Sequence, residues 1–308
     1  MAHGKWTFAH YKQILPGYHV QAGAYHAAAK SGIIRGMNPW FFLAAVVVII
    51  VLALLIPHWR LKRAVSAPFP EEWDTALERN SEVYRHLPQP LRGRLRSLVK
   101  EFLHDKHFSG AGGLEITDEI RVTIAAEACM LILNRRSGVY PGLRYLIVYP
   151  SAFIVAREGR DDAGVVDVSS RDLLGESWGN GKVILAWDSV LRGARNFGDG
   201  QNVVLHEFAH QLDSEDGSAD GAPLLAGESS YRSWAAVLTN EFEILQQRSR
   251  KGQPSLLDEY GASHPAEFFA VATETFFEKP RQMAQHHVEL FDTLKTYYRL
   301  DPREWRRQ

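Results

Sequence analysis

The chain has very little cysteine and very little net charge. Cys129 is the only cysteine in 308 residues, so an intramolecular disulfide is excluded. This lack is typical of a reducing compartment, although many periplasmic proteins share it. Cys129 lies in an apolar run, residues 125–133, which favours a buried, inert thiol. The formal net charge of −1 excludes the basic footprint of most nucleic-acid-binding proteins, and we expect no direct binding of nucleic acid.

Long runs without charge are also scarce, and one near the N-terminus therefore stands out. From Trp40 to Ile56 the chain carries no charged residue. As a helix this run would span about 26 Å, within the range for a hydrocarbon core of about 30 Å. Trp40 and Trp59 lie near its ends, as interfacial anchors do. We predict one transmembrane helix over residues 40–57, since a buried core helix, the alternative, would usually show a polar edge.

The charges around this run bear on its orientation. Three basic residues follow the run closely, namely Arg60, Lys62 and Arg63. Two more precede it at a distance, namely Lys30 and Arg35. Positive charge favours the cytoplasmic side, and the bias is clear if the chain starts natively at Met37. We expect that start, or a disordered extension over residues 1–36. The predicted location is the inner (cytoplasmic) membrane, single-pass, with the following domain in the cytoplasm; a cytoplasmic protein is the alternative.

Helical and strand-like patterns follow the membrane run. We predict an N-terminal extension over residues 1–39, a linker over residues 58–70, and one domain over residues 71–300. Expected helices cover residues 72–80, 90–106, 117–133, 201–212, 231–248, 265–278 and 288–298. Expected strands cover residues 143–149, 153–156 and 182–187. The predicted fold class is therefore α+β, mostly helical with a small mixed sheet.

The pentapeptide His206-Glu207-Phe208-Ala209-His210 is the most informative motif. Residues i and i+4 share one face of a helix, so His206 and His210 can point at one metal ion. Glu207 lies between them and can reach a water bound to that ion. This is the H-E-x-x-H signature of zinc peptidases, in which the two His are ligands and the Glu is the general base. The alternative is a surface helix that happens to carry two His.

A catalytic zinc site needs a third protein ligand. The metzincin pattern, with a His six residues after His210, fails because Asp216 stands there. The helical segment 265–278 offers two candidates, Glu267 and Glu274, which lie near one helix face. A carboxylate in so apolar a helix is costly to bury unless it is paired or bound to metal. That argument does not separate the two candidates.

Two segments carry a resemblance to a known family, residues 206–213 and the sequence YGASHPAEFFA over residues 260–270. Together with residues 113–117 and 140–143, they resemble the Mlc titration factor A family of gluzincin-type zinc peptidases, over roughly residues 68–300. The chain is also similar to the catalytic domain of anthrax lethal factor. The resemblance implies a zincin-like fold and one catalytic Zn²⁺. It also implies that Glu267 is the third ligand, beside His206 and His210.

Further roles follow from the resemblance. Glu207 takes a proton from the zinc-bound water as it attacks the peptide carbonyl, and passes that proton to the leaving amine. Tyr260, seven residues before Glu267, donates a hydrogen bond to the oxyanion. A core or rim aromatic is the alternative for Tyr260. Asp213 and Glu274 are candidates to orient the metal-bound imidazoles, with plain solvated or capping carboxylates as the alternative.

Other features near the motif receive lesser predictions. His264 precedes Pro265 at the start of a helix and is not a convincing ligand. His286 and His287 are most simply an exposed pair. In zinc peptidases of this kind an edge strand aligns the peptide by backbone pairing, and residues 182–187 are the candidate here. An ordinary core strand is an equally good interpretation.

We therefore expect a membrane-anchored zinc metallopeptidase that acts on a peptide or protein. Aminopeptidase-like activity is compatible with the sequence, but no short motif distinguishes exopeptidase from endopeptidase action. The resemblance implies a further partner, because the family has a member that sequesters a glucose-responsive transcriptional repressor. A regulatory protein of that kind, catalytic or not, is the alternative. In an intramembrane protease the motif would lie in an apolar span. This alternative is disfavoured because the motif is flanked by the polar residues Gln201, Asn202, Asp213, Glu215 and Asp216.

Overall fold

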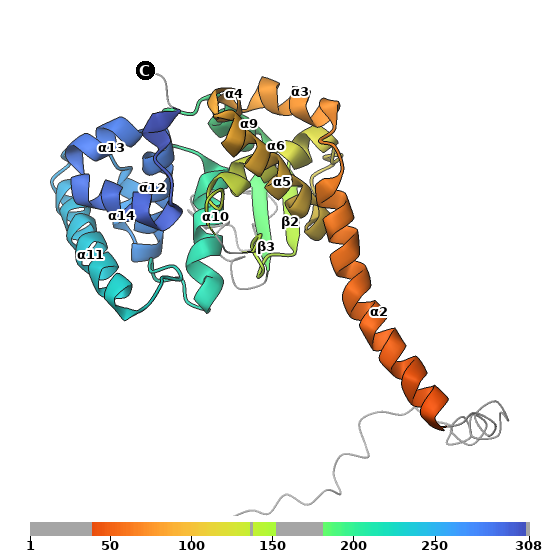
Figure 1. Ribbon diagram of the computed structural model, residues 1–308. Helices are drawn as coiled ribbons and strands as arrows, with labels where there is room; N and C mark the ends of the chain where they lie inside the picture. Colours follow the sequence, from red (N-terminus) through yellow and green to blue (C-terminus); the bar gives the residue numbers. More distant parts are fainter. Residues whose placement is uncertain (1–38, 136–137, 152–180, 306–308) are drawn as a thin grey trace, which may run out of the picture. The chain divides into compact units, whose positions relative to one another are not determined.

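The computed structural model describes residues 39–135, 138–151 and 181–305. The chain divides into two compact units, residues 1–59 and residues 60–308. Almost all of the extension predicted over residues 1–39 lies outside the described residues, as does the strand predicted over residues 153–156. The second unit is mostly helical with a small sheet, which confirms the predicted fold class (Figure 1).

Helix α2 extends from Pro39 to Ser66, and its large apolar side chains are exposed. Among the described residues it is the helix that is long and apolar enough to cross a membrane, judged by length and composition. The linker predicted over residues 58–70 is shorter than expected, because the helix continues past Pro57. Proline removes one helical hydrogen bond, but its φ fits a helix, so the backbone can pass through it. Residues 67–70 alone separate α2 from the next helix.

The first half of the second unit contains the sheet. In chain order it comprises α3 (Glu71–Asn80), α4 (Glu82–His86), α5 (Gln89–Asp105), β1 (His107–Gly110), α6 (Asp118–Met130), β2 (Tyr145–Tyr149), β3 (Lys182–Ala186) and α9 (Trp187–Arg195). The described strands lie in the order β1-β2-β3, and both pairs are parallel. The sheet predicted to be mixed is thus parallel in the described part of the chain. Parallel neighbours need a crossover, and α6 lies in the one between β1 and β2.

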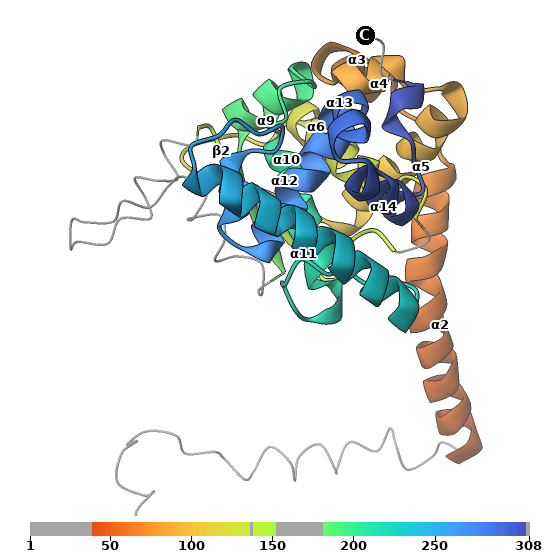
Figure 2. The ribbon, with the colours of Figure 1, turned by 90° about the vertical axis from the view of Figure 1, so that its left-hand side faces the viewer.

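The second half of the unit carries the motif helix. It comprises α10 (Val203–Asp213), η3 (Ser214–Asp216), α11 (Glu228–Arg250), η4 (Glu259–Ala262), α12 (Pro265–Glu278), α13 (Pro280–His286), α14 (Val288–Tyr298) and η5 (Pro302–Glu304). Helix α10 packs against α12, α6, α9 and β3. In Figure 1 it stands between the sheet and the C-terminal helices, and Figure 2 shows α11 in front of α12 when viewed from those helices. The motif helix is therefore a core helix.

The core follows the predicted patterns where these were strongest. Leu146 and Val148 of β2, with Val183 and Leu185 of β3, are fully buried and alternate with less buried residues, as the period of two predicts. Cys129 is fully buried, as predicted, and burial raises the pKa of its thiol well above the usual value. The pattern did not reveal β1, because most of its four residues are exposed.

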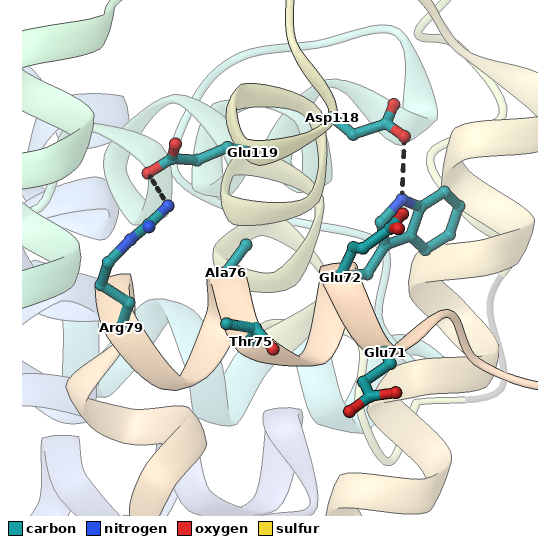
Figure 3. Close-up of a pocket in the computed structure, with 8 residues that line it drawn as sticks. Glu71, Glu72, Thr75, Ala76, Arg79, Asp118 and Glu119 are labelled. Carbon is teal, nitrogen blue, oxygen red and sulfur yellow. Dashed lines mark hydrogen bonds and ion pairs between the residues drawn. The ribbon is translucent and has the colours of Figure 1, made fainter.

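An acidic cleft lies between helices α3 and α6. Carboxylates from the first turns of both helices line it (Figure 3). Asp118 Oδ2 accepts a hydrogen bond of 3.0 Å from the indole Nε1 of Trp73, and Glu119 pairs with Arg79 at 2.7 Å. Negative charge is favourable at helix N-termini. The cleft contains no motif residue, so we interpret its carboxylates as structural.

Candidate metal centre

Helix α10 starts at a strong cap and places both motif His on one face. The side-chain oxygen of Asn202 accepts hydrogen bonds of 3.1 Å from the backbone N–H groups of Val204 and Leu205. The rings of His206 and His210 have their centroids 4.9 Å apart, as the i and i+4 spacing predicts. His206 is 7% exposed and His210 is 0% exposed. Both imidazoles are therefore inside the protein.

Helix α12 brings the third group to these imidazoles. It runs over the predicted residues, Pro265–Glu278, and all residues after Pro265 are buried. Glu267 Oε2 lies 3.0 Å from His206 Nε2 and 3.5 Å from His210 Nε2. The two Nε2 atoms are 3.2 Å apart. One ligand atom from each residue lies within 4.8 Å of the others, so this buried group can hold a metal ion.

The charges of the three groups are strongly coupled. Burial lowers the pKa of His206, but hydrogen bonds with Glu267 and Glu274 outweigh burial and raise the pKa to about 10. Burial lowers the pKa of His210 to about 4. Burial opposes ionisation of Glu267, yet its contacts with both imidazoles lower its pKa to about 2. The site thus stabilises a positive charge on His206 beside the ionised carboxylate of Glu267. A proton on this imidazole competes with a metal ion for the same nitrogen.

Glu274 contacts His206 from the other side of its ring. Its Oε1 lies 2.7 Å from His206 Nδ1, and its Oε2 accepts a hydrogen bond of 2.5 Å from the backbone N–H of Asn202. The carboxylate therefore joins α12 to the start of α10 and turns His206 Nε2 toward Glu267. Of the two carboxylates that helical spacing left open, Glu267 lies at Nε2 and Glu274 lies at Nδ1. A carboxylate at the second ring nitrogen is typical of metal-bound His.

The two predicted catalytic residues lie at the same centre. Glu207 is 3% exposed, and its charge contributes to the raised pKa of His206. Tyr260 is half-buried in η4, and its ring centroid lies 6.1 Å from that of His206. Asp258 holds this turn by accepting a hydrogen bond of 2.9 Å from the backbone N–H of Tyr260. The fold therefore brings all five predicted site residues together.

The structure excludes a solvated position for Asp213 and corrects the prediction for His287, while an orienting role of Asp213 stays a prediction. Asp213 is fully buried, and its Oδ2 accepts a hydrogen bond of 2.9 Å from the backbone N–H of Gly221. It therefore anchors the loop that follows α10, and burial raises its pKa to about 7. His287 is half-buried and pairs with Glu241 at 2.7 Å, so only His286 is exposed. His264 caps α12, as its place before Pro265 predicted.

Two further buried carboxylates were missed from the sequence. Glu127 of α6 accepts hydrogen bonds from Ser81 Oγ at 2.7 Å and from the side chain of Asn202 at 3.2 Å, and burial raises its pKa to about 7. Glu278 at the end of α12 accepts a hydrogen bond of 2.7 Å from the backbone N–H of Gly200, and burial raises its pKa to about 9. The signal in the sequence that could have revealed these two residues is a single carboxylate inside an apolar run.

The candidate edge strand lies beside the motif helix. Within the described residues, β3 ends the strand order and contacts α10. It is one residue shorter than the predicted segment 182–187, because Trp187 begins α9. The position at the edge of the described sheet agrees with the strand that we expected to align a peptide; the pairing itself stays a prediction.

Comparison with known proteins agrees with this geometry. Residues 56–299 match the family described as glucose-regulated metallo-peptidase M90. An uncharacterized protein of Synechocystis sp. is 39% identical over 250 residues, which cover 80% of this chain and 91% of that protein. Mlc titration factor A of Pectobacterium atrosepticum is 30% identical over 236 residues, covering 75% and 87%. Mlc titration factor A of Klebsiella pneumoniae is 31% identical over 243 residues, covering 77% and 88%.

These matches confirm the resemblance to the Mlc titration factor A family, while the similarity to anthrax lethal factor stays a prediction. The family match covers the motif helix, α12 and the sheet, so the His-His-Glu group lies inside the matched region. The chain belongs to the glucose-regulated metallo-peptidase M90 family.

Proposed function

We propose that this protein is a zinc-dependent peptidase whose metal ligands are His206, His210 and Glu267. The observation that carries the proposal is the convergence of two imidazole nitrogens and one carboxylate oxygen from two separate helices. Membership of a metallo-peptidase family supports it. Three protein ligands are typical of a catalytic zinc site, whereas structural sites usually have four.

The spacing of the donor atoms fits zinc. For bonds of about 2.0–2.1 Å in a tetrahedron, neighbouring ligand atoms lie about 3.3–3.4 Å apart. The three donor pairs here are separated by 3.0, 3.2 and 3.5 Å. Nitrogen and carboxylate oxygen donors are also the ligand types that zinc prefers. The side chains thus need little movement to receive this ion.

The protein's own groups supply the rest of the chemistry. A bound zinc ion would lower the pKa of a water and polarise the peptide carbonyl. Glu207 accepts the proton of the attacking water and then delivers it to the leaving amine. The Tyr260 hydroxyl donates a hydrogen bond to the oxygen that becomes negative. Through its contact with Nδ1, Glu274 favours the His206 tautomer that carries its proton at Nδ1 and presents Nε2 to the site. Burial of these groups excludes bulk water.

We further propose that α2 anchors the enzyme in the cytoplasmic membrane. Its length and apolar composition support a membrane span, and its exposed apolar residues support contact with lipid. Basic residues follow the apolar stretch, and they favour a cytoplasmic position for the metal centre. Substrates are then peptides or proteins of the cytoplasm or of the membrane surface.

A second function, regulation by protein binding, is favoured by the relatives. Two similar proteins bear the name Mlc titration factor A, and the family is described as glucose-regulated. We propose that a transcriptional repressor is a partner of this chain as well. Co-purification of such a repressor with a variant that lacks the metal ligands would support a binding role that is independent of catalysis.

Replacement of Glu207 by Gln tests the catalytic proposal. The change keeps the size of the side chain and removes the base, so we expect peptide hydrolysis to fall by about 10²–10⁴-fold or more. Zinc content should stay near one per chain, because Glu207 is not a ligand. Hydrolysis of a peptide mixture and zinc by mass spectrometry are the measurements. Full activity of this variant would contradict the proposed mechanism.

A further inference from the structure

A cavity with both polar and apolar lining lies beside the end of the motif helix, outside the chemistry proposed above. Its volume is about 350 Å³. Helix α10 and η3 form one wall through Gln211, Ser214 and Glu215. The opposite wall consists of residues 140–143, which precede β2, and of Gly181, which precedes β3. The cavity therefore lies between the catalytic helix and the beginning of the candidate edge strand.

Two of the residues that line this cavity carry a buried polar atom without a hydrogen-bond partner among the described residues. Gln211 is 8% exposed, and its Nε2 makes no hydrogen bond within the described part of the chain. The Glu215 side chain is 8% exposed; Oε2 pairs with Arg135 at 3.4 Å, whereas Oε1 has no partner among the same residues. A buried donor or acceptor that is left unsatisfied lowers stability. The cavity is thus suited to a group that accepts from Gln211 and donates to Glu215.

The position of Gln211 relates the cavity to the proposed reaction. Gln211 lies four residues after Glu207, so both side chains occur on one face of α10, about 6 Å apart along the helix axis. An extended peptide advances about 3.3 Å per residue. A side chain in the cavity would therefore belong to a residue within about two or three positions of the cleaved bond.

We propose that this cavity is a substrate subsite that binds a carboxamide side chain, that of Asn or Gln. The proposal rests on the peptidase function proposed above. The amide oxygen of the substrate accepts a hydrogen bond from Gln211 Nε2, and the amide nitrogen donates one to Glu215 Oε1.

Other side chains fit the cavity less well. A Lys or Arg side chain would satisfy Glu215 alone and would approach the guanidinium of Arg135, which already pairs with Glu215. A carboxylate would satisfy Gln211 alone and would be repelled by Glu215. An apolar side chain would leave both polar groups unpaired in a dry site. The specificity thus follows from one donor and one acceptor on the same wall of the cavity.

Matched peptides test this subsite with the full-length protein in detergent. Peptides that carry Gln, Asn, Leu, Lys or Glu at one position are compared, for each position within three residues of the cleaved bond. At one position we expect Gln or Asn to exceed Leu and Glu by about tenfold or more in kcat/KM, because a site built for hydrogen bonds rejects an analogue that lacks them. Binding of the same peptides is measured in zinc-loaded Glu207→Gln protein, which reports on the subsite even when no peptide is cleaved.

Two substitutions of Gln211 give opposite expectations. Gln211→Met keeps the volume and removes the donor, so the preference for carboxamides should disappear. Gln211→Glu replaces the donor with an acceptor, so the preference should change to Lys or Arg. Gln247→Glu makes the same chemical change at an exposed position of α11 and should keep the wild-type preference. Circular dichroism and zinc content identify any variant that fails to fold.

The outcomes separate the two proposals. Cleavage and binding without any preference for Asn or Gln overturn the subsite and leave the peptidase function intact, and they would indicate that ordered water satisfies the two groups. An unchanged preference in Gln211→Glu also overturns it. If the wild type cleaves no peptide but binds carboxamide peptides selectively, the subsite is retained and the catalytic proposal fails.

Discussion

Helices α2 and α12 are both strongly apolar, yet their surroundings are opposite. Helix α2 carries no acidic residue in its first turn, and its Trp, Phe, Leu and Ile side chains are exposed. Helix α12 is buried from Ala266 to Glu278 and nevertheless contains three carboxylates inside the protein, Glu267, Glu274 and Glu278. The exposed apolar part of α2, residues 40–56, lacks charge, whereas the buried helix α12 contains it, which is the reverse of the usual distribution in soluble proteins.

The different distribution of charge in the two helices indicates a different surrounding for each. An apolar surface with no protein over it is stable only against another apolar phase, so α2 suits lipid. A buried carboxylate is costly unless it is paired, hydrogen-bonded or bound to metal. Glu267 and Glu274 each contact His206, and Glu278 accepts a backbone hydrogen bond from Gly200. The carboxylates of α12 thus indicate the candidate metal centre. Their positions along the helix predict that their substitution changes zinc affinity by different amounts.

Removal of Glu267 should have the largest effect. In Glu267→Ala one of the three proposed metal ligands is lost, so we expect zinc affinity to fall by more than about 100-fold, the upper range for the loss of a mere supporting partner. Peptide hydrolysis should disappear with the metal. Zinc titration against a chelator, together with a peptide assay, measures both. Wild-type zinc affinity in this variant would refute the proposed ligand set.

Glu274→Gln should have an intermediate effect on the same site. The change weakens the partner of His206 Nδ1, so zinc affinity should fall by about 10–100-fold while the metal can still be loaded at high concentration. Glu278→Gln, one helical turn further along α12, is the matched control, because Glu278 hydrogen-bonds to the backbone N–H of Gly200. Equal zinc affinities in these two variants would show that Glu274 does not support His206.

Glu278→Gln should instead change stability, and the sign depends on pH. Burial raises the pKa of Glu278 from 4.5 to about 9, so the folded state binds the proton that the unfolded state has lost. Its contribution is fully favourable below about pH 4.5 and is lost as the pH rises toward 9. The neutral Gln avoids this loss, which is on the order of 3 kcal/mol at pH 7.

Melting temperatures between pH 5 and pH 9 test that sign. Glu278→Gln should melt about 5 °C or more above the wild type at pH 8, and the difference should shrink toward pH 5. A constant difference across this range would mean that Glu278 is ionised in the folded protein. Glu289→Gln, on the exposed side of α14, controls for the general effect of removing a carboxylate.

Changes in α2 should have the smallest effect on chemistry and the largest effect on location. A chain that starts at Arg60, where the second compact unit begins, should leave the membrane fraction and keep its peptide hydrolysis. Val48→Arg with Leu52→Arg in the full chain should also reduce insertion, since each Arg costs about 2.5–3.5 kcal/mol at the centre of a span. Fractionation and assay of both forms decide the matter, and retention of the truncated chain in the membrane would contradict the anchor.

Most of the fold was accessible from local patterns. Helices α12 and α14 occupy the predicted residues, and α3, α5 and α10 differ by a few residues at their ends, because caps and period determine long helices. The short elements β1, α4, α9 and α13 were missed. Helices and strands of this length have too few residues for a period to emerge, and tertiary packing stabilises them.

The candidate site shows the same division. Spacing alone paired His206 with His210 and named Glu207 between them, and the resemblance added Glu267 and Tyr260. Contacts between distant segments were not readable, such as that of Asn202 with Glu127, which lies 75 residues earlier. The orientation of Gln211 and Glu215 into one cavity was also hidden, because it depends on how two turns before β2 and β3 approach α10.

The sequence by itself determined the family, the exposed apolar helix and the motif that brings two imidazoles to one face. These are local properties, set by composition and by the 3.6-residue period of the helix. Only the tertiary structure decided which carboxylate of α12 faces His206 Nε2 and which faces Nδ1. Glu267 and Glu274 share a helix face, and their distinct roles arise from the packing of α12 across α10, which no spacing along one helix can specify.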